Sequence, residues 1–188
     1  MSPKNAQVLQ EPQPGLFLIA DPFLADPGFS KSIIFLVSHD HSGSVGFILN
    51  QPGVLKVGHV IDGFPEEKTV MHGGPVALDQ VFFIHTCPRV TGSYHIRENL
   101  HWAGAPDALR SAVDYGLLSM NEILFFNGYS GWGPGQLVQE LEDKSWILAN
   151  LDTKCLFDKP EGLWKNSLRA LGGHYAWLSE APEHPQLN

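Results

Sequence analysis

The apolar residues in the first half of the chain come in short runs that end at turn residues, which is the pattern of β-strands. The run from Ser32 to Asp40 is apolar over most of its length, so we expect a central strand covered on both faces. Residues 40–43 are turn formers, and the strands on either side of them should form a hairpin. The same reasoning predicts strands at residues 15–20, 32–40, 44–50, 69–72, 80–87 and 93–102.

The second half of the chain alternates between strand and helix patterns. In the region 134–144, the spacing of Leu137, Val138 and Leu141 predicts the buried face of a helix. Residues 51–67 are rich in loop formers, with a short helix expected near 55–61. Strands are predicted at 121–129 and 145–151, and helices at 105–116, 134–144 and 163–173.

Hairpins followed by a β-loop-α-β unit predict an α+β fold. The expected sheet is mixed and largely antiparallel, with hairpins in the N-terminal half and helices packed on it from the C-terminal half. Residues 15–178 should form a single domain with room for a small second lobe. Residues 1–14 and 179–188 are polar and contain several prolines, so we expect a flexible arm and a flexible tail.

Composition narrows the classes of function. The formal net charge is −8, and the 12 lysines and arginines are scattered along the chain, which disfavours direct binding to DNA. The chain opens without the apolar core of a signal peptide, and no apolar run approaches the roughly 18 residues of a membrane span. Cys87 and Cys155 lack C-x-x-C spacing and are expected to be free thiols. We therefore expect a cytoplasmic protein without a membrane segment.

The chain contains nine histidines, but their spacing does not predict a metal centre. His39 and His41 flank Asp40 in the predicted turn region, and no H-E-x-x-H pattern is present. Ser130 follows a predicted strand without the G-x-S-x-G pattern of a nucleophile elbow. The sequence thus identifies no catalytic residue, metal or cofactor and does not favour an enzyme. An alternative reading is an enzyme of unknown reaction, with a pocket near Asp21, His39, His85 and the glycine-rich residues 128–136.

The stretch "NGYSGWGPGQLVQEL", residues 127–141, connects a predicted strand to a predicted helix. Free N–H groups at the start of such a helix favour an anion. However, Gln136 stands where the P-loop pattern requires lysine, and the glycines do not follow G-x-G-x-x-G. Trp132 is expected to cover the strand–helix junction, with small glycines around it allowing close approach. The sequence therefore favours a structural joint, with an anion or ligand site as the alternative.

Three segments give a resemblance to a known family: "GLFLIADPFLADPGFSKSIIFLVSHDHSGSVGFILNQP", "MHGGPVALDQVFFIHT" and "NGYSGWGPGQLVQELEDKSWILA". In this order they resemble the bacterial YqgE/AlgH family, an uncharacterised protein family, and the resemblance extends from Gly15 to Leu171. The stretch from Ser93 to Asp114 departs from the family pattern. The matching positions are Asp21, Pro22, Asp26, Phe29, Ser32, His39, Gly43, Gly46, Asn50, Pro52, Gly73, Gly74, Pro75, Val76, His85, Gly128, Gly131, Trp132, Gly135, Gln136, Leu137, Glu140 and Trp146.

The resemblance implies an α+β fold and brings the label of a transcriptional regulator, without an established reaction, cofactor or catalytic residue. Since the chain is acidic and shows no helix-turn-helix pattern, we expect regulation to be indirect, through an unknown protein or small-molecule ligand. The leading hypothesis is therefore a regulatory or binding module. Its candidate pocket residues are Asp21, Asp26, His39, Asn50, Gly73, Gly74, His85, Gly128, Ser130, Gly131, Trp132, Gly135 and Gln136.

Overall fold

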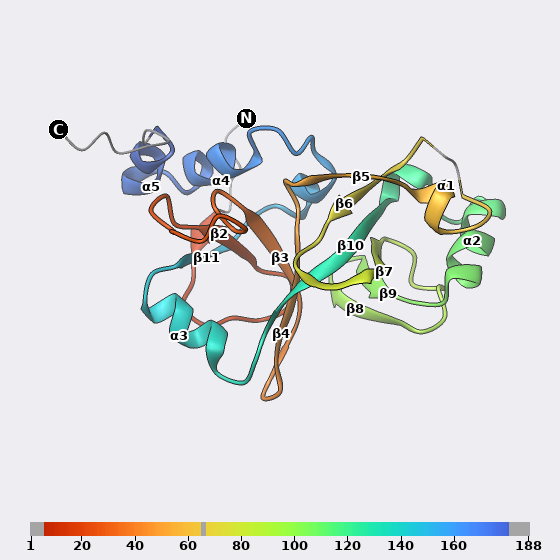
Figure 1. Cartoon of the computed structure of the whole chain (residues 1–188), viewed down its shortest axis with the longest axis horizontal. Helices are drawn as coiled ribbons and strands as arrows, with labels where there is room; N and C mark the ends of the chain where they lie inside the picture. The colour runs from red at the N-terminus through yellow and green to blue at the C-terminus, as the bar shows by residue number, and fades with distance from the viewer. Residues whose placement is uncertain (1–5, 65–66, 181–188) are drawn as a thin grey trace.

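One strand, β10 (Ile123–Trp132), connects the two halves of a mixed sheet (Figure 1). The computed structural model describes residues 6–64 and 67–180. Early in β10, Ile123–Asn127 pairs antiparallel with β7 (Val76–His85), and its last residues pair antiparallel with β4 (Gly43–Ile48). In between, β10 also pairs parallel with β6 (Thr69–His72). The expected α+β fold with a mixed, largely antiparallel sheet is confirmed.

The strand order of the 11-stranded sheet is β1-β11-β2-β3-β4-β10-β7-β9-β8, with β6 on β10 and β5 on β6. We call β1, β11, β2, β3 and β4 the β3 half, and β5, β6, β7, β8 and β9 the β7 half. The other strands are β1 (Gln7–Val8), β2 (Phe17–Ala20), β3 (Ile33–Asp40), β5 (Pro52–Lys56), β8 (Ser93–Arg97), β9 (Leu100–Ala103) and β11 (Trp146–Asn150).

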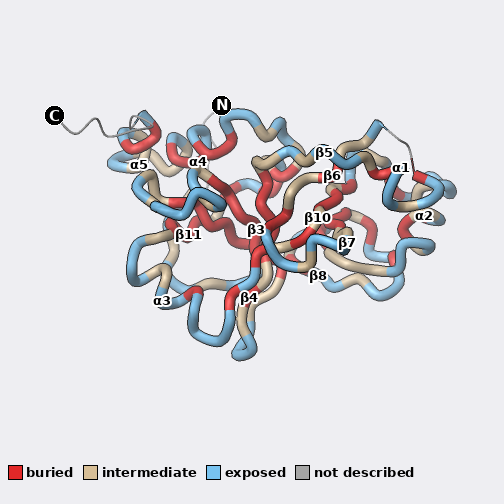
Figure 2. The backbone as a smooth tube through the Cα atoms, viewed as in Figure 1, coloured by how far each residue is buried: buried red, intermediate tan, exposed pale blue. Residues whose placement is uncertain are grey.

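The β3 half is covered on both faces, as the unbroken apolar runs predict. In β2, Phe17 and Ile19 face one apolar core, whereas Leu18 and Ala20 face another. The first core includes Trp164 of α4 (Leu163–Leu171), whose indole N–H also donates to the Ala20 carbonyl at 2.9 Å. The second core is closed by α3 (Gln136–Glu142). Figure 2 shows the resulting buried segments along β3 and β10.

The β7 half has its own apolar core, formed where β7 and β10 face α1 (Val57–Val60) and α2 (Pro106–Asp114). Pro106 lies at the start of α2, and Leu109 and Ala112 are its buried residues. These positions agree with the helix predicted at 105–116. Two short 3₁₀ helices, Met120–Glu122 and Thr153–Phe157, precede β10 and follow β11.

Several local predictions were wrong. The single strand expected at 93–102 is the hairpin β8–β9, because Glu98 adopts a φ of 52° and reverses the chain. Residues 52–56, expected to be loop, form β5 ahead of α1. A further helix, α5 (Gly173–Leu178), follows α4 after Gly172. Val138 of α3, expected to be buried, is 42% exposed.

The described ends of the chain lie beside the β3 half (Figure 1). Within the segment assigned to an arm, Gln7 and Val8 pair antiparallel with Asn150 and Ala149 of β11. Residues 1–5 of the predicted arm and 181–188 of the predicted tail lie outside the described residues.

The backbone of β10 is crossed at close range by the turn between β6 and β7, which contains Gly73 and Gly74. A Cβ on Gly74, whose φ is +146°, would lie 2.3 Å from the carbonyl carbon of Tyr129. A Cβ on Gly128, whose φ is +70°, would lie 2.5 Å from the carbonyl oxygen of Gly74. Ser130 is fully buried here and donates its hydroxyl to the Gly73 carbonyl at 3.2 Å. Only glycine permits this approach of two backbones.

This crossing predicts a large loss of stability for Gly74→Ala. The added methyl group would overlap the Tyr129 backbone, which cannot move without breaking strand pairs, so we expect a loss of about 3 kcal/mol in the free energy of unfolding. The matched control is Gly116→Ala, because Gly116 has a φ of +68° but nothing within 4 Å of its Cβ position. That variant should lose only about 1 kcal/mol, the cost of the left-handed backbone. Urea unfolding measures both; equal losses would contradict the role of the crossing.

Candidate ligand-binding groove

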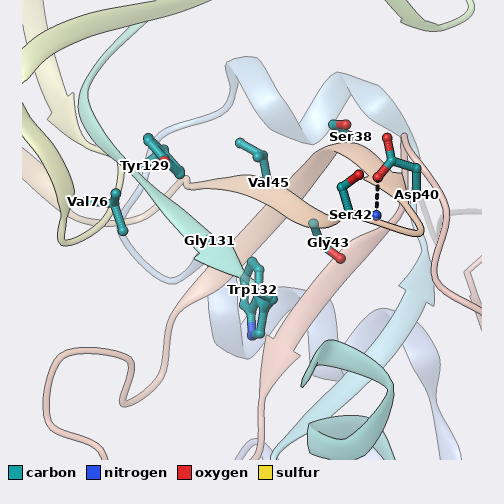
Figure 3. Close-up of a pocket in the computed structure, with 10 residues that line it drawn as sticks. Ser38, Asp40, Ser42, Gly43, Val45, Val76, Tyr129, Gly131 and Trp132 are labelled. Atoms are coloured by element: carbon teal, nitrogen blue, oxygen red, sulfur yellow. Dashed lines mark hydrogen bonds between the residues drawn. The ribbon is translucent and has the colours of Figure 1, made fainter. Parts of the chain in front are cut away.

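An open groove of about 420 Å³ lies beside the β3–β4 hairpin and the last residues of β10 (Figure 3). Its polar residues come from the end of β3, the following turn and the start of β4, and its apolar residues come from β4, β7 and β10. The lining residues are Ser38, Asp40, Ser42, Gly43, Ser44, Val45, Val76, Tyr129, Gly131 and Trp132.

Strand pairing explains which side chains share the face of the groove. Ser38 pairs with Val45, and Val45 pairs with Gly131, so these three residues form one row across the sheet. Asp40 and Gly43 pair in the next row toward the tip of the hairpin. Because alternate residues of a strand point to the same face, the two rows are separated by about 6.6 Å.

Gly131, which has no side chain, lines the groove on the β10 side. A Cβ at Gly131 would lie 3.0 Å from Cε2 of Tyr129, so the tyrosine ring fills the space that a side chain at this position would need. Tyr129 packs edge-on against Phe82, with the ring centroids 5.5 Å apart. In Figure 3, Val76 and Tyr129 lie at one end of the groove and Asp40 and Ser42 at the other. The groove therefore has an apolar end and a polar end.

Asp40 supplies the charge of the polar end. The backbone N–H of Ser42 donates to its carboxylate at 2.7 Å. This hydrogen bond is the main reason why the pKa of Asp40 lies below its ordinary value. The carboxylate consequently remains negative at neutral pH.

The opposite face of the same strands is anchored to α3. Trp132 and Trp146 both donate their indole N–H groups to one oxygen of Glu140, at 2.9 and 2.7 Å. Gln136 donates to the other oxygen of this carboxylate at 2.9 Å. On this face His39 also contacts Ser44, with 2.7 Å between Nδ1 and Oγ. The end of β10 is thus held firmly behind the groove.

The stretch 127–136 is organised differently from the predicted loop. Residues up to Trp132 continue β10, and only 133–135 connect it to α3. Gly135 has a φ of +74° and precedes the helix, while the side chain of Gln136 accepts a hydrogen bond from the Gly133 N–H at 3.0 Å. The Gly133 N–H is therefore occupied within the junction, ahead of a helix of 7 residues.

Of the residues proposed from the sequence, Gly131 and Trp132 line the groove. Gly73, Gly74, Gly128 and Ser130 meet at the crossing described above, where the backbones are in contact rather than lining a cavity. Asn50 joins β3 to the end of β4, accepting from the Ile33 N–H at 2.9 Å and donating to the Lys31 carbonyl at 2.8 Å.

Asp21 and Asp26 have local roles in the connection between β2 and β3. Asp21 accepts from the N–H of Phe23 at 2.9 Å, and Asp26 accepts from the N–H of Gly28 at 2.8 Å. Both are turns in which a carboxylate binds the backbone two residues ahead. These turns give both Asp-Pro pairs a structural role in the connection between β2 and β3.

The structure places His39 and His85 at opposite ends of β10. His39 pairs with Ser44, the partner of Trp132, whereas His85 pairs with Ile123. A strand of this length spans roughly 30 Å. The alternative hypothesis of an enzyme requires the two imidazoles to lie in one cleft. The structure places them too far apart for this.

His85 is instead part of the interior of the β7 half. It is fully buried, its Nε2 lies 3.2 Å from the Ala103 carbonyl, and its Nδ1 has no hydrogen-bond partner among the described residues. Its ring stacks on His101 at 5.8 Å, and His95 contacts His101 edge-on at 5.2 Å. Burial is the main cause that lowers the pKa of His85.

Within residues 6–64 and 67–180, no cluster of three or more His, Cys, Asp or Glu side chains could hold a metal ion. None of the helices in this part of the chain is long and apolar enough to cross a membrane.

Cys87 and Cys155 are free thiols, and burial raises the pKa of Cys155 to about 12, so its thiolate does not form at neutral pH.

Sequence reasoning missed most of the residues that line the groove. Ser38, Asp40 and Ser42 belong to a hairpin tip that reads as an ordinary polar turn, and Val45, Val76 and Tyr129 come from distant segments. A signal for Ser38 and Asp40 was present, because they alternate with Val37 and His39 where the buried run of β3 ends. The register that brings Gly131 next to Val45 has no local signal.

The fold and the groove define an α+β protein with a surface site that is open along its length. The sequence pattern of the AlgH-like family matches residues 17–176, and the chain belongs to this family. It is 40% identical over 178 residues to a UPF0301 protein of Cytophaga hutchinsonii, covering 93% of this chain and 98% of that protein. It is also 40% identical to a UPF0301 protein of Chlorobium limicola, over 94% of this chain and 96% of that one.

Solved structures agree with this assignment. The solution structure of the AlgH protein from Pseudomonas aeruginosa matches with a TM-score of 0.72 and 29% identity, covering 95% of this chain and 100% of that chain. The crystal structure of a Corynebacterium diphtheriae protein shares the fold, with a TM-score of 0.77 and 22% identity over 90% of this chain and 92% of that one. The resemblance deduced from the sequence motifs is confirmed.

Glu140→Ala tests the anchor behind the groove. Removing the carboxylate leaves two largely buried indole N–H groups without their acceptor, so we expect a loss of about 2 kcal/mol in the free energy of unfolding. The indole fluorescence should change as well, because both tryptophans lose the same partner. The matched control is Glu142→Ala on the exposed side of α3, which should change stability by less than about 0.5 kcal/mol. A Glu140 variant as stable as the control would contradict the anchoring role.

The lowered pKa of buried His85 predicts that the stability of the protein depends on pH. Because the folded pKa lies below the ordinary value of 6.5, the unfolded chain binds the proton more readily. The stabilising contribution is therefore complete above pH 6.5 and is lost as the pH falls toward the folded pKa. The melting temperature should be measured by thermal unfolding between pH 8 and pH 5. As the pH falls, it should decrease more steeply for the wild type than for His85→Gln, which keeps a donor for the Ala103 carbonyl. His174→Gln is the control, since His174 is exposed; identical slopes for the wild type and His85→Gln would contradict the prediction.

Proposed function

We propose that this protein is a binding module whose groove receives a partner, and that any effect on transcription is indirect. The observation that carries the proposal is the open groove with an apolar end at Val76 and Tyr129 and a charged end at Asp40. The hydrogen bonds that attach β10 to α3 support the proposal, because a preformed surface loses less conformational entropy when it binds a partner. The free cysteines agree with a cytoplasmic location.

An open surface site supports binding more than catalysis. Enzymes need a nucleophile or base held near the reacting group, usually with water excluded. The histidines proposed from the sequence are far apart, and the groove does not enclose its contents. The net charge of −8 and the single carboxylate in the groove also disfavour a nucleic-acid backbone as the ligand.

A peptide-display selection tests the proposal. The full chain would be screened against a random dodecapeptide library, and selected peptides would be measured again on Ser38→Trp, in which a large side chain extends over the part of the groove next to Val45. We expect a set of peptides whose affinity for Ser38→Trp falls at least tenfold. Gln7→Trp, on an exposed strand at the far edge of the sheet, is the matched control and should bind them normally.

Both variants must unfold cooperatively near the wild-type temperature, which confirms that the fold is intact. If all the selected peptides bind Ser38→Trp as tightly as the wild type, the groove is not the binding site and the proposal fails.

A further inference from the structure

Three histidines form one row across the neighbouring strands β7, β9 and β8 (Figure 1). His85 of β7 pairs with His101 of β9, and His101 pairs with His95 of β8. Side chains of directly paired residues lie on the same face of a sheet, so the three imidazoles are neighbours. The ring centroids of His85 and His101 are 5.8 Å apart and those of His95 and His101 are 5.2 Å apart. We call these three residues the histidine row.

Each imidazole of the row lies within hydrogen-bonding distance of one backbone carbonyl of the β8–β9 hairpin. The three contacts are His85 Nε2 to Ala103 at 3.2 Å, His101 Nδ1 to Asn99 at 3.1 Å and His95 Nε2 to Glu98 at 2.9 Å. Because a carbonyl oxygen accepts and does not donate, the imidazole nitrogen carries the hydrogen at each contact. A neutral imidazole has one N–H group, so in the neutral form all three N–H groups of the row bind the hairpin.

Two of these carbonyls belong to residues with a strained backbone. Glu98 has a φ of 52° and Ala103 has a φ of 60°, in the left-handed region that residues other than glycine seldom adopt. Such a conformation persists only where the surroundings hold it. The contacts from His95 and His85 are restraints of this kind, so the histidine row helps to hold the hairpin in its observed shape.

The buried end of the row resists a second proton. His85 is fully buried, and its Nδ1 has no hydrogen-bond partner among the described residues. A proton on Nδ1 would create a buried charge without a well-placed acceptor, next to the stacked ring of His101. Burial lowers the pKa of His85 and His101 lowers it further, whereas the backbones of Ala103 and Cys87 favour the charged form without outweighing burial.

The carboxylates on the elements around the row are already engaged. Glu98 of the hairpin pairs with Arg97 at 3.0 Å, Glu122 before β10 accepts from the Thr86 hydroxyl at 3.1 Å, and Asp107 of α2 pairs with Arg110 at 2.8 Å. Arg89 in the β7–β8 connection and Asp114 at the end of α2 are exposed to solvent. The titratable side chain that acts on His85 is that of His101, which opposes a positive charge.

The β8–β9 hairpin also joins the edge of the β7 half to the β3 half. Ile96 and Leu100 are buried in the apolar core that β2 and β3 share. The Arg97 guanidinium donates to the Gly15 carbonyl at 3.0 Å and to the side-chain oxygen of Asn150 at 2.8 Å. Release of the hairpin would open this core at one side, whereas the pairs of β3 with β2 and β4 do not involve the hairpin.

We propose that the histidine row is a pH-sensitive switch: as the pH falls from about 7.5 to about 5.5, protonation of the row releases the β8–β9 hairpin from β7 and from the β3 half, while the remaining strands stay folded. The released state exposes Ile96 and Leu100 to solvent. This inference adds a conformational response to pH and does not depend on the groove.

Hydrogen exchange of the full chain, followed in ¹H–¹⁵N correlation spectra at pH 7.5 and pH 5.5, tests the switch. After correction for the intrinsic effect of pH, the protection of the amides in residues 93–103 should fall by about tenfold or more. His85 alone accounts for about tenfold, because pH 5.5 is about one unit below its ordinary pKa of 6.5 and only the opened chain takes up the proton readily.

The opening should be local. At pH 5.5 the hairpin amides should exchange faster than those of β3, and their exchange should depend only weakly on urea, because a local opening exposes little surface. Amides of β3 should instead show the steep urea dependence of global unfolding.

A double variant separates protonation from the hydrogen bonds. His85→Gln keeps an amide N–H for the Ala103 carbonyl, and His101→Asn keeps one for the Asn99 carbonyl, but neither side chain titrates. With both substitutions, most of the loss of hairpin protection at pH 5.5 should disappear. His59→Gln, at an exposed position of α1, is the control and should respond to pH as the wild type does.

Three results would overturn the switch. In the first, the hairpin amides of the wild type keep their protection at pH 5.5. In the second, they exchange together with those of β3 and with the same urea dependence, so that acid only favours global unfolding. In the third, the double variant loses hairpin protection as the wild type does. The first two results need the wild type alone, so they decide the question even if the double variant does not fold.

Discussion

The close contact between two backbones at Gly73, Gly74 and Gly128 holds the molecule together at its centre. A strand normally keeps its neighbours along its whole length, whereas β10 changes from β7 and β6 to β4 within a few residues. The chain between β6 and β7 must cross β10 at this point, and the Cβ distances of 2.3 to 2.5 Å show that side chains would prevent it. Because β10 is the strand common to both halves, their relative orientation is set by this crossing.

The groove is a consequence of the same change of partner. After Tyr129, the pairing of β10 with β7 ends, and the last residues of β10 project beside the β3–β4 hairpin. Val76, the first residue of β7, therefore stays near Tyr129 and forms the apolar wall of the groove. Gly131 follows two residues later and has no side chain, and the Tyr129 ring packs beside it in the space that a side chain would need.

Most of the strands and helices could be predicted from the sequence, because their signals are local. The apolar run at Ile33–Val37 and the Pro106 start of α2 each depend on a few neighbouring residues. The hairpin at 98–99 could not be predicted, because its turn uses Glu98 at a positive φ in place of glycine or asparagine. The glycine-rich stretch was predicted as a loop between a strand and a helix, but its residues up to Trp132 continue β10, and this continuation depends on pairing with β4, which is distant in sequence. The groove depends on three such pairings at once, and local patterns do not contain that information.

The two faces of β10 near its end explain why a small surface can hold a fixed shape. On the inner face, Trp132 is anchored with Trp146 to Glu140, and His39 contacts Ser44. On the outer face, Gly131 and Val45 carry little side-chain bulk and leave the backbone close to the surface. The inner contacts therefore restrain the strands without occupying the outer face. Two residues of the inner-face contacts, Trp132 and Ser44, also line the groove, so the restrained face and the groove meet at these positions.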